Sequence, residues 1–440
     1  MFPVQSVRNI NAESWACGDK YSMKPITALI FGLTLCLAPS ALTANSHHAP
    51  THKSKTSAHV QDPASVQKHL SSKQHSTRPA STKTVHSTHS SAKHGHVQYA
   101  SLSVHHRRSY ERFTGNSFAD NVSNGDQILG EDPVVRAAAV DALGNMNGTV
   151  VAIDPNTGRI LAMVNQNLAL SSGAEPCSTI KVSVALAALQ EGIITKDTPV
   201  NLGGAYHLNL TEALAHSNNL YFETLGRTLG FERVRHYANQ FGLGEMAGYN
   251  IPGEQLGIYP DQELPAKQGG VGRMCSFGEG VSMTPLQLGA LVSAIANGGT
   301  LYYLQHPTTP EEALLFQPRV KRTLDIGKII PEIQDGMQAA VQYGTARSLR
   351  ANFKEFPVMG KTGTCSNNGT RFGWFASYAD TQYGRIVTVF FLEGGRPTFG
   401  PKAAELTGLF YRNLWDHSYF AVKTPILDKT ITPATVGLSQ

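Results

Sequence analysis

The chain has 440 residues, with 37 Lys and Arg against 32 Asp and Glu, 17 His, and a formal net charge of +5. This length exceeds one average domain, but length by itself does not set the number of domains. The basic excess lies between residues 45 and 110, where nine Lys and Arg face a single acid, Asp62. From about Glu111 onward the chain is slightly acidic, which argues against a protein that binds nucleic acid.

Residues 1–44 are predicted to direct export. The stretch MKPITALIFGLTLCLAPSALTA begins at Met23, a candidate true start, and combines a lysine, a short apolar run and small residues near Ala44. This is the pattern of a secretory signal. The run is shorter than the roughly 20 apolar residues of a membrane span. A cleaved signal is therefore the first interpretation, and an uncleaved anchor in the inner membrane is the alternative. Either places the protein in the periplasm or at the cell surface.

Residues 45–110 are rich in Ser, Thr, His and Lys and hold few large apolar side chains. Such a segment cannot bury enough surface to offset its chain entropy, so we expect a disordered linker. Imidazoles are good ligands for zinc or copper. The spacing of these histidines is irregular, however, and favours a linker over a metal site. Residues 111–146 are interpreted as a lead-in segment and residues 421–440 as a C-terminal tail.

Regular secondary-structure signals begin near Asn147. In GTVVAIDPNTGRILAMV, β-branched runs flank a strong turn cluster, which predicts a strand, a turn and a strand. Helical patterns follow, with Ser178 near the start of the first, Thr211 as the expected cap of the second and Pro285 in the first turn of the third. These four patterns cover residues 178–191, 209–229, 284–297 and 331–343.

Three runs separated by Gly and Asn come next, VMGKTGTC, RFGWFASYA and RIVTVFFLEG, and a last helix covers residues 399–415. The three runs are typical of successive antiparallel strands. Two strands, a block of helices, three strands and a final helix predict an α/β (α+β) fold. In such a fold an antiparallel central sheet is flanked by helices.

The first of three short motifs is Ser178-Thr179-Ile180-Lys181. Residues three apart on a helix share a face, so Lys181 can reach the Ser178 hydroxyl. A serine is a weak nucleophile until a neighbour takes its proton. A desolvated lysine close to another cation can be neutral and serve as that base. A backbone N–H at the helix start is available to an oxyanion. By itself the motif also fits a helix start with a solvated lysine.

The second motif, Lys361-Thr362-Gly363, lies in an expected strand. Strand alternation places Thr362 and Thr364 on one face, and Lys361, Gly363 and Cys365 on the other. Two hydroxyls facing a cleft can hold a carboxylate, and Gly363 permits the close approach of another element. The interpretation without a functional role is a lysine on a surface hairpin. The third motif, Ser217-Asn218-Asn219, is by itself only a polar step between a helix and a loop.

In this order, the motifs S-x-x-K, S-x-N and K-T-G are those of serine β-lactamases and penicillin-binding proteins. The chain resembles the penicillin-binding protein transpeptidase domain over residues 147–420. The opening hairpin, the stretch SFGEGVSMTPLQLGALVSAIANGG, GTAR at Gly344 and WFASYA at Trp374 are also similar to that family. The resemblance implies a β-lactamase/transpeptidase-like fold, with an all-helical subdomain bordering the active-site cleft. It also implies peptidoglycan stem peptides as substrates, β-lactams as covalent inhibitors, cell-wall synthesis proteins as partners, and no cofactor or metal.

The resemblance also implies roles for individual residues. Ser178 would attack the carbonyl of a D-Ala-D-Ala stem and form an acyl-enzyme, with Lys181 accepting its proton. Ser217 would relay a proton to the leaving D-alanine while Lys361 fixes its hydroxyl. Asn219 would hydrogen-bond the substrate amide. The Ser178 and Thr364 N–H groups would form the oxyanion hole, and the remaining substrate contacts would come from Thr362, Gly363 and the Thr364 hydroxyl.

The sequence departs from the family at three points. Cys177 stands where the residue before the nucleophile is usually glycine, the interval from Ser178 to Ser217 is short, and no folded N-terminal module is expected. Cys177 and Cys365 adjoin the two proposed oxyanion donors. Two buried thiols are therefore one interpretation and a disulfide is the other, with Cys275 unpaired. A D,D-carboxypeptidase, a class D-like β-lactamase or β-lactam sensor, and an inactive wall-binding scaffold remain alternatives.

Overall fold

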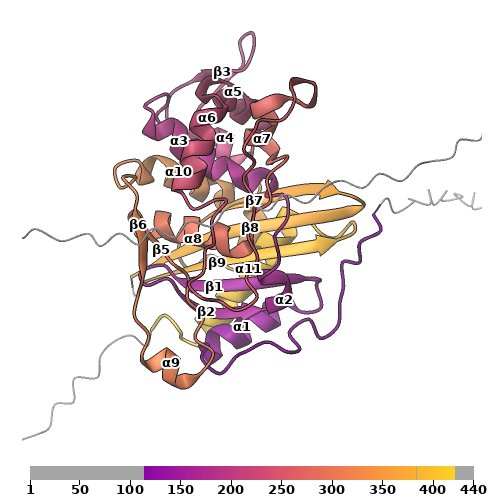
Figure 1. Cartoon of the computed structure of the whole chain (residues 1–440), viewed down its shortest axis with the longest axis vertical. Coiled ribbons are helices and arrows are strands. Elements are labelled where there is room, and N and C mark those ends of the chain that lie inside the picture. Colours follow the sequence, from indigo (N-terminus) through magenta and orange to yellow (C-terminus); the bar gives the residue numbers. More distant parts are fainter. Residues whose placement is uncertain (1–112, 383, 422–440) are drawn as a thin grey trace, which may run out of the picture. The chain divides into compact units, whose positions relative to one another are not determined.

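The computed structural model describes residues 113–421 except residue 383, and these belong to the second of two compact units, Ser101–Gln440. The signal or anchor, the linker and the C-terminal tail beyond residue 421 lie outside the described residues. A five-stranded sheet in the order β2-β1-β9-β8-β7 forms the centre of the unit (Figure 1). Its strands are β1 (Gly148–Asp154), β2 (Arg159–Val164), β7 (Val358–Asn367), β8 (Thr370–Thr381) and β9 (Gly384–Gly394).

Every neighbouring pair in this sheet is antiparallel. The opening hairpin and the three late strands therefore form as the sequence predicts, and β7, which carries Lys361-Thr362-Gly363, is an edge strand. Alternation divides the sheet residues between two buried clusters. Val151 and Trp374 belong to the cluster on one face, and Val150 and Phe375 belong to the cluster on the other.

Helices cover both faces of the sheet. The apolar α8 (Pro285–Ala296) packs on one face against β1, β8 and β9. Its N-terminus is fixed by a capping box between Thr284 and Gln287, and Pro285 is its first residue, as expected. On the other face, α11 (Gly400–Asp416) and α1 (Pro133–Leu143) pack on the sheet and on each other.

Sequence analysis did not identify α1. Two of its start signals are nevertheless present in the sequence. The Asp132 side chain accepts hydrogen bonds from two backbone N–H groups of the first turn, and Pro133 occupies the first helical position. The part of the lead-in segment that forms α1 therefore packs on the sheet.

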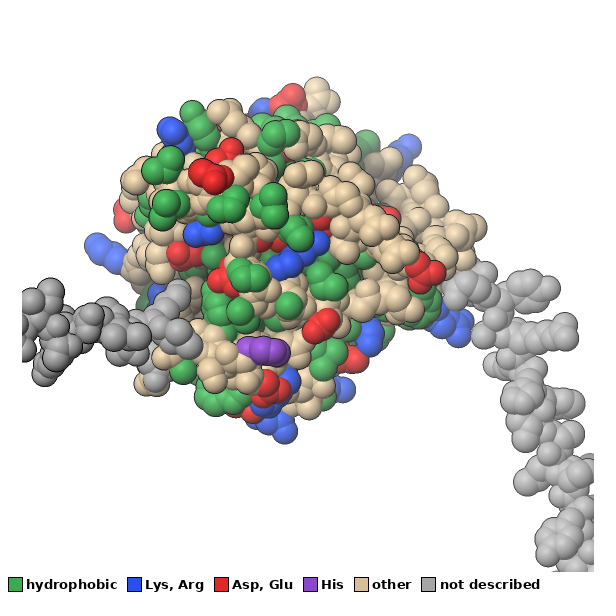
Figure 2. Space-filling view, turned by 90° about the horizontal axis from the view of Figure 1, so that it is seen from below, with side chains coloured by type: hydrophobic (Ala, Val, Ile, Leu, Met, Phe, Trp, Pro, Cys, Tyr) green, Lys and Arg blue, Asp and Glu red, His purple; other side chains and the backbone are tan. Residues whose placement is uncertain are grey.

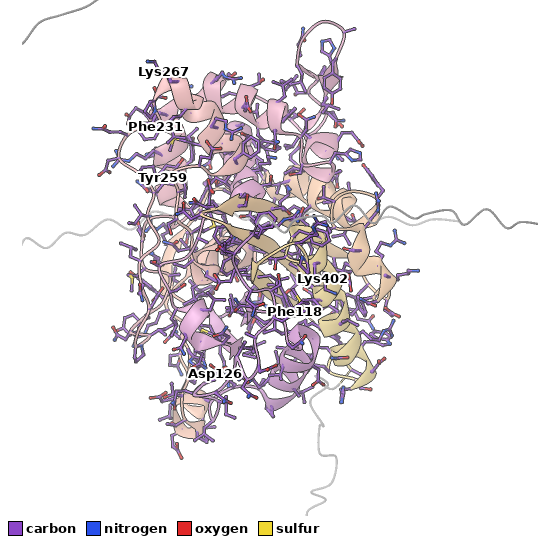
Figure 3. The ribbon with its side chains drawn as sticks, turned by 90° about the vertical axis from the view of Figure 1, so that its right-hand side faces the viewer. Phe118, Asp126, Phe231, Tyr259, Lys267 and Lys402 are labelled. Atoms are coloured by element: carbon purple, nitrogen blue, oxygen red, sulfur yellow. A yellow bond between two sulfur atoms is a disulfide. The ribbon has the colours of Figure 1, made fainter. Side chains whose placement is uncertain are left out.

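A second group of helices lies beyond the β7 edge, at the top of Figure 1. Figure 3 shows the same division: Phe231, Tyr259 and Lys267 lie in this upper part, and Asp126 lies near the opposite end. The upper helices are α3 (Lys181–Gln190), α4 (Leu210–Ala215), α5 (Asn219–Leu229), α6 (Phe231–Gln240), α7 (Gly270–Phe277) and α10 (Ile330–Gln342). We call them the helical lobe.

Short elements complete the unit. They are α2 (Gln166–Ala169), α9 (Pro310–Leu314), β3 (Val200–Asn201), β4 (His207–Leu208), β5 (Thr300–Tyr302), β6 (Val320–Thr323) and the 3-10 turns η1 (Cys177–Ile180), η2 (Ala266–Gln268) and η3 (Arg347–Ala351).

Lys and Arg are interspersed with Asp, Glu and apolar side chains on the face shown in Figure 2. None of the helices between residues 113 and 421 combines the length and apolar character needed to cross a membrane.

The second helical pattern differs from its prediction. Residues 209–229 form two helices, because the chain leaves the helical conformation between Ala215 and Asn219 and Ser217 takes a φ of +55°. The cap of α4 is Asn209, whose side chain accepts from the Glu212 N–H, and Thr211 lies inside the helix. The expectation of Thr211 as cap was therefore wrong, because Asn209 already fills the capping position.

Candidate active site

The proposed nucleophile lies where the helical lobe meets β7. Ser178 is on η1, and Lys181 begins α3 directly after it. One helical turn therefore joins the two side chains, and Lys181 Nζ lies 3.0 Å from Ser178 Oγ. Lys181 is completely buried and Ser178 is partly exposed. The Lys181 amine, which is shielded from water, thus lies beside the Ser178 hydroxyl, which a ligand can reach.

The S-x-N motif surrounds the same lysine. Lys181 Nζ is 2.8 Å from the Ser217 carbonyl oxygen, 3.1 Å from Ser217 Oγ and 2.7 Å from Asn219 Oδ1. Ser217 has φ +55°, a strained conformation for a residue with a Cβ, and such strain is concentrated at functional sites. The Asn218 side chain caps α5 by accepting from the Tyr221 N–H, which fixes the turn that presents Ser217.

Lys361 reaches the site from the sheet. Its Nζ donates to Ser217 Oγ at 2.8 Å and to the Thr362 carbonyl at 3.0 Å, and its side chain is 1% exposed. The three motifs are therefore joined by a chain of contacts from Ser178 through Lys181 and Ser217 to Lys361. Sequence order alone could not show this meeting, because 144 residues separate Ser217 from Lys361.

Burial changes the acidity of both lysines. The pKa of Lys181 is well below its usual value, chiefly because burial penalises the ammonium and secondly because the Lys361 cation repels it; Glu223 opposes these effects. Burial also lowers the pKa of Lys361 to about 7. Lys181 is thus neutral under conditions in which an ordinary lysine is protonated, as a general base for serine must be.

Strand alternation along β7 is as predicted. Lys361 contacts Ser217, Gly363 faces η1, and Cys365 is bonded to Cys177, so all three point toward the helical lobe side. Thr362 and Thr364 point to the other face. The Thr364 hydroxyl accepts a hydrogen bond from the Gly400 N–H. Because Thr364 is exposed, it is the hydroxyl of the two that a ligand can reach.

Thr362 already has a partner within the protein. It is 4% exposed, and its hydroxyl donates to Thr345 Oγ1 at 2.7 Å. Thr345 in turn donates its backbone N–H to the carbonyl of Ala215, near Ser217. A Cβ on Gly344 would lie 2.1 Å from that carbonyl oxygen, so the approach requires glycine. No role for GTAR was expected from the sequence, and the structure shows that this segment fixes the Ser217 turn relative to β7.

The segment before the nucleophile is held closely against the sheet. Trp374 on β8 donates from Nε1 to the Glu175 carbonyl at 3.0 Å, and Thr179 Oγ1 donates to the Pro176 carbonyl at 2.7 Å. Cys177 and Cys365 form a disulfide with a Cα–Cα distance of 5.5 Å. Of the two interpretations, two buried thiols or a disulfide, the structure thus shows the disulfide, and Cys275 is a free, buried cysteine.

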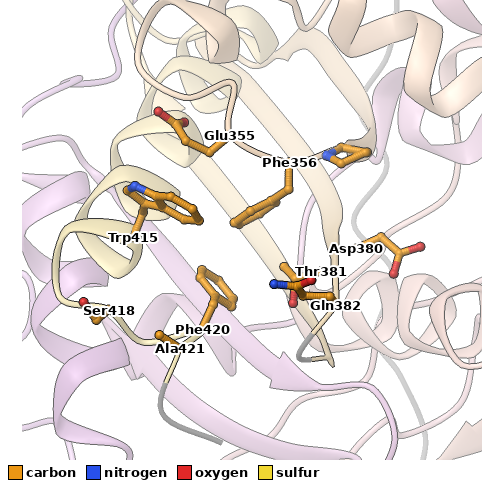
Figure 4. A pocket seen from close by; sticks show the side chains of 10 residues that line it. Glu355, Phe356, Asp380, Thr381, Gln382, Trp415, Ser418, Phe420 and Ala421 are labelled. Carbon is orange, nitrogen blue, oxygen red and sulfur yellow. The ribbon is translucent and has the colours of Figure 1, made fainter.

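The hollows of the domain do not all belong to this site. One of about 440 Å³ lies between Glu175 and the end of β7 at Asn367, and so borders the nucleophile segment. A larger hollow, of about 550 Å³, lies elsewhere, between Phe356, Trp415 and Phe420 (Figure 4). It contains none of the predicted site residues. We therefore take the lysine and serine cluster, where buried ionisable groups meet, as the candidate site in preference to this larger hollow.

The fold and this cluster together define a protein of the class that includes the serine β-lactamases and the penicillin-binding proteins. Residues 148–408 match the family "Penicillin binding protein transpeptidase domain". Because this match covers more than half of the chain, the protein belongs to the penicillin-binding protein transpeptidase family.

Curated relatives agree with this assignment. The chain is 25% identical over 391 residues to the peptidoglycan D,D-transpeptidase MrdA of Acinetobacter baumannii, covering 71% of this chain and 57% of the relative. It is 31% identical over 257 residues to the stage V sporulation protein D of Bacillus subtilis, covering 49% and 39%. The chain thus spans about half the length of these relatives.

Two solved structures share the fold. The D,D-transpeptidase domain of a peptidoglycan glycosyltransferase from Eggerthella lenta has a TM-score of 0.53 at 20% identity, covering 65% of this chain and 82% of that one. Pseudomonas aeruginosa PBP2, solved in complex with WCK 5153, has a TM-score of 0.54 at 23% identity, covering 66% and 74%.

Proposed function

We propose that the protein is a peptidoglycan D,D-transpeptidase that acts through an acyl-enzyme on Ser178. The observation that carries the proposal is a completely buried Lys181, with a strongly lowered pKa, 3.0 Å from the Ser178 hydroxyl. Such a lysine removes the proton as the serine attacks. The D-Ala-D-Ala stem as substrate follows from family membership and from the names of the relatives.

The remaining steps use the contacts around Ser217. Ser178 Oγ attacks the carbonyl carbon of the penultimate D-alanine and Lys181 takes the hydroxyl proton. The oxyanion forms between the backbone N–H groups of Ser178 and Thr364, a type of donor often worth about 3 kcal/mol. Ser217, in contact with both lysines, passes a proton to the departing D-alanine amine. The free amine of a second stem then attacks the acyl-enzyme and forms the cross-link.

Substrate contacts are assigned to the partly exposed groups. Asn219 Oδ1 accepts from Lys181, which leaves the side-chain nitrogen to donate to the substrate amide carbonyl. Thr364 is exposed and binds the terminal carboxylate. Gly363 permits the close contact between β7 and η1 on which the site depends. Thr362 supports Thr345, and its proposed contact with the carboxylate would require the Thr345 bond to open.

We place the activity outside the cytoplasm, in the periplasm or at the cell surface. A disulfide between Cys177 and Cys365 persists in oxidising compartments and is rare in the cytosol. The relative MrdA is named as a peptidoglycan D,D-transpeptidase, and action on peptidoglycan agrees with export. A cleaved signal or an inner-membrane anchor within residues 1–44 would deliver the domain there, and other cell-wall synthesis proteins are the proposed partners.

The test is covalent labelling with a fluorescent penicillin, followed by product analysis on stem peptides. Wild type should label, Ser178→Ala should not, and stem peptides should yield cross-linked dimers with release of D-alanine. Labelling of Ser178→Ala would refute the nucleophile. Release of D-alanine without dimers would identify a D,D-carboxypeptidase. Rapid turnover of the penicillin would identify a β-lactamase, and a wild type that does not label would indicate an inactive scaffold.

A further inference from the structure

Cys177 is an unusual residue for its position. Its φ is +53°, in the left-handed region that glycine adopts freely and that strains any residue with a Cβ. The cysteine at this position is completely buried and is joined to Cys365 on β7. The disulfide therefore depends on a residue that the backbone conformation disfavours, which indicates a specific use for the bond.

The bond connects the two segments that carry the proposed oxyanion donors. Ser178 directly follows Cys177, and Thr364 directly precedes Cys365. Each sulfur is therefore one residue away from a donor N–H in sequence, and the two Cα atoms of the bonded residues lie 5.5 Å apart. One segment belongs to η1 and the other to the edge strand of the sheet, so the bond crosses the boundary between them.

The other contacts across this boundary are non-covalent. Gly363 lies so close to η1 that a Cβ on it would be 2.8 Å from the Pro176 carbonyl oxygen. Behind the segment, Gly278 leaves space for the Pro176 ring and the Cys177 carbonyl. These packing contacts hold η1 close to β7 without joining the two segments covalently. The disulfide adds a covalent restraint one residue from each donor.

We propose that the Cys177–Cys365 disulfide is the positioning element of the oxyanion hole, which sets the separation of the Ser178 and Thr364 N–H groups. Acyl transfer is then fast only in the oxidised protein. The two cysteines do not touch the substrate and act through their neighbours. The proposal rests on the proposed acyl-enzyme function. A dithiol would reverse the effect, because it gives two electrons and two protons to the disulfide, leaves two thiols and itself becomes a cyclic disulfide.

The competing explanation is a bond that only stabilises the fold. The cysteines are 188 residues apart, so the bond restricts a long loop of the unfolded chain. That role predicts a lower melting temperature without the bond but an unchanged chemical step in molecules that remain folded. A positioning role predicts a slower chemical step, with substrate affinity and pH profile retained.

The first test compares full-length variants by stopped-flow reaction with a fluorescent penicillin. Cys177→Gly removes the bond and relieves the backbone, and Cys365→Ala removes the bond alone. The expected result is a fall of about tenfold or more in the first-order acylation constant of both variants. The dissociation constant of the initial complex should stay within twofold. Complete loss of one oxyanion donor lowers the rate constant about 10²–10³-fold, and displacement of a donor lowers it less.

A matched control separates positioning from stability. Leu143 is 1% exposed in α1, on the sheet face opposite the helical lobe, so Leu143→Ala destabilises the domain away from the site. Reactions are run at a temperature where each variant is folded by circular dichroism. Leu143→Ala should melt earlier and acylate at the wild-type rate. An acylation constant within twofold of wild type in both cysteine variants would overturn the proposal.

The second test does not depend on how the variants fold. Wild type is treated with dithiothreitol under native conditions, and the opened bond is verified by alkylation and peptide mass analysis. The acylation constant should fall by the same factor and return on reoxidation, while Cys365→Ala should not respond. An unchanged rate in reduced wild type also overturns the proposal. A wild type that never labels refutes the proposed function instead.

Discussion

The substitution Gly363→Ala tests the close contact between β7 and the nucleophile segment. An added Cβ would lie 2.8 Å from the Pro176 carbonyl oxygen and 3.1 Å from Thr179 Cγ2. The first distance is shorter than Cβ contacts in proteins, and its partner is backbone, which cannot rotate away. The strand and η1 must therefore separate by about half an ångström before ordinary contact is restored.

The size of the effect follows from that separation. Overpacking of this kind costs about 1–3 kcal/mol in the free energy of unfolding. A misplacement of about 1 Å at a reacting centre can cost about 100-fold in rate. Half of that displacement, between the segments of Ser178 and Thr364, should slow acylation by a penicillin about tenfold.

The assay is the second-order rate constant of acylation by a fluorescent penicillin, with stability measured by urea unfolding. Gly327→Ala is the matched control, because the Cβ added there meets only the Gly298 carbonyl oxygen at an ordinary 3.5 Å. It should change neither rate nor stability appreciably. A Gly363→Ala protein that acylates within twofold of wild type would show that the contact does not control the site geometry.

Two further predictions concern the lysines and Trp374. Because the base must be neutral, acylation should rise with pH as Lys181 loses its proton, and loss of the Lys361 ammonium near pH 7 should act in the opposite direction and lower the rate. Lys361→Gln removes the cation that helps to lower the Lys181 pKa, so the rise of the acylation rate should move to higher pH. The decrease in rate caused by deprotonation of Lys361 should disappear. A rise that stays at the same pH would refute the electrostatic coupling between the two lysines. Lys196→Gln, which alters an exposed lysine paired with Asp335, should leave the profile unchanged. Trp374→Phe leaves the Glu175 carbonyl without its donor and should lower the free energy of unfolding, measured in urea, by about 1–3 kcal/mol. Trp415→Phe changes a side chain that is 45% exposed and should lower it little. Equal losses in the two variants would contradict a stabilising role for the Trp374 hydrogen bond.

The sequence predicted much of the fold because its signals are local. The turn between β1 and β2, the proline in the first turn of α8 and the three late strands depend on neighbouring residues, and each formed as expected. The failures were local as well. Sequence analysis missed the Asp132-Pro133 start of α1, and it joined α4 and α5 into one helical pattern, although Ser217 takes a left-handed conformation between them.

The sequence by itself determined the candidate site residues. Three motifs in a fixed order identified Ser178, Lys181, Ser217 and Lys361, and strand alternation placed Lys361, Gly363 and Cys365 on one face. The places of Cys177 and Cys365 beside the two proposed donors left two interpretations open, two buried thiols or a disulfide, and the structure shows the disulfide.

Only the tertiary structure decided the pKa of the site lysines and the hydrogen-bond partners of the site residues. A lysine acquires a low pKa from complete burial and from a second cation, and both conditions arise from segments far apart in the chain. The bond from Thr362 to Thr345 and the anchoring of Glu175 by Trp374 likewise join distant elements. Sequence patterns report which face a side chain occupies. Which group lies opposite that face depends on how the helical lobe packs against β7.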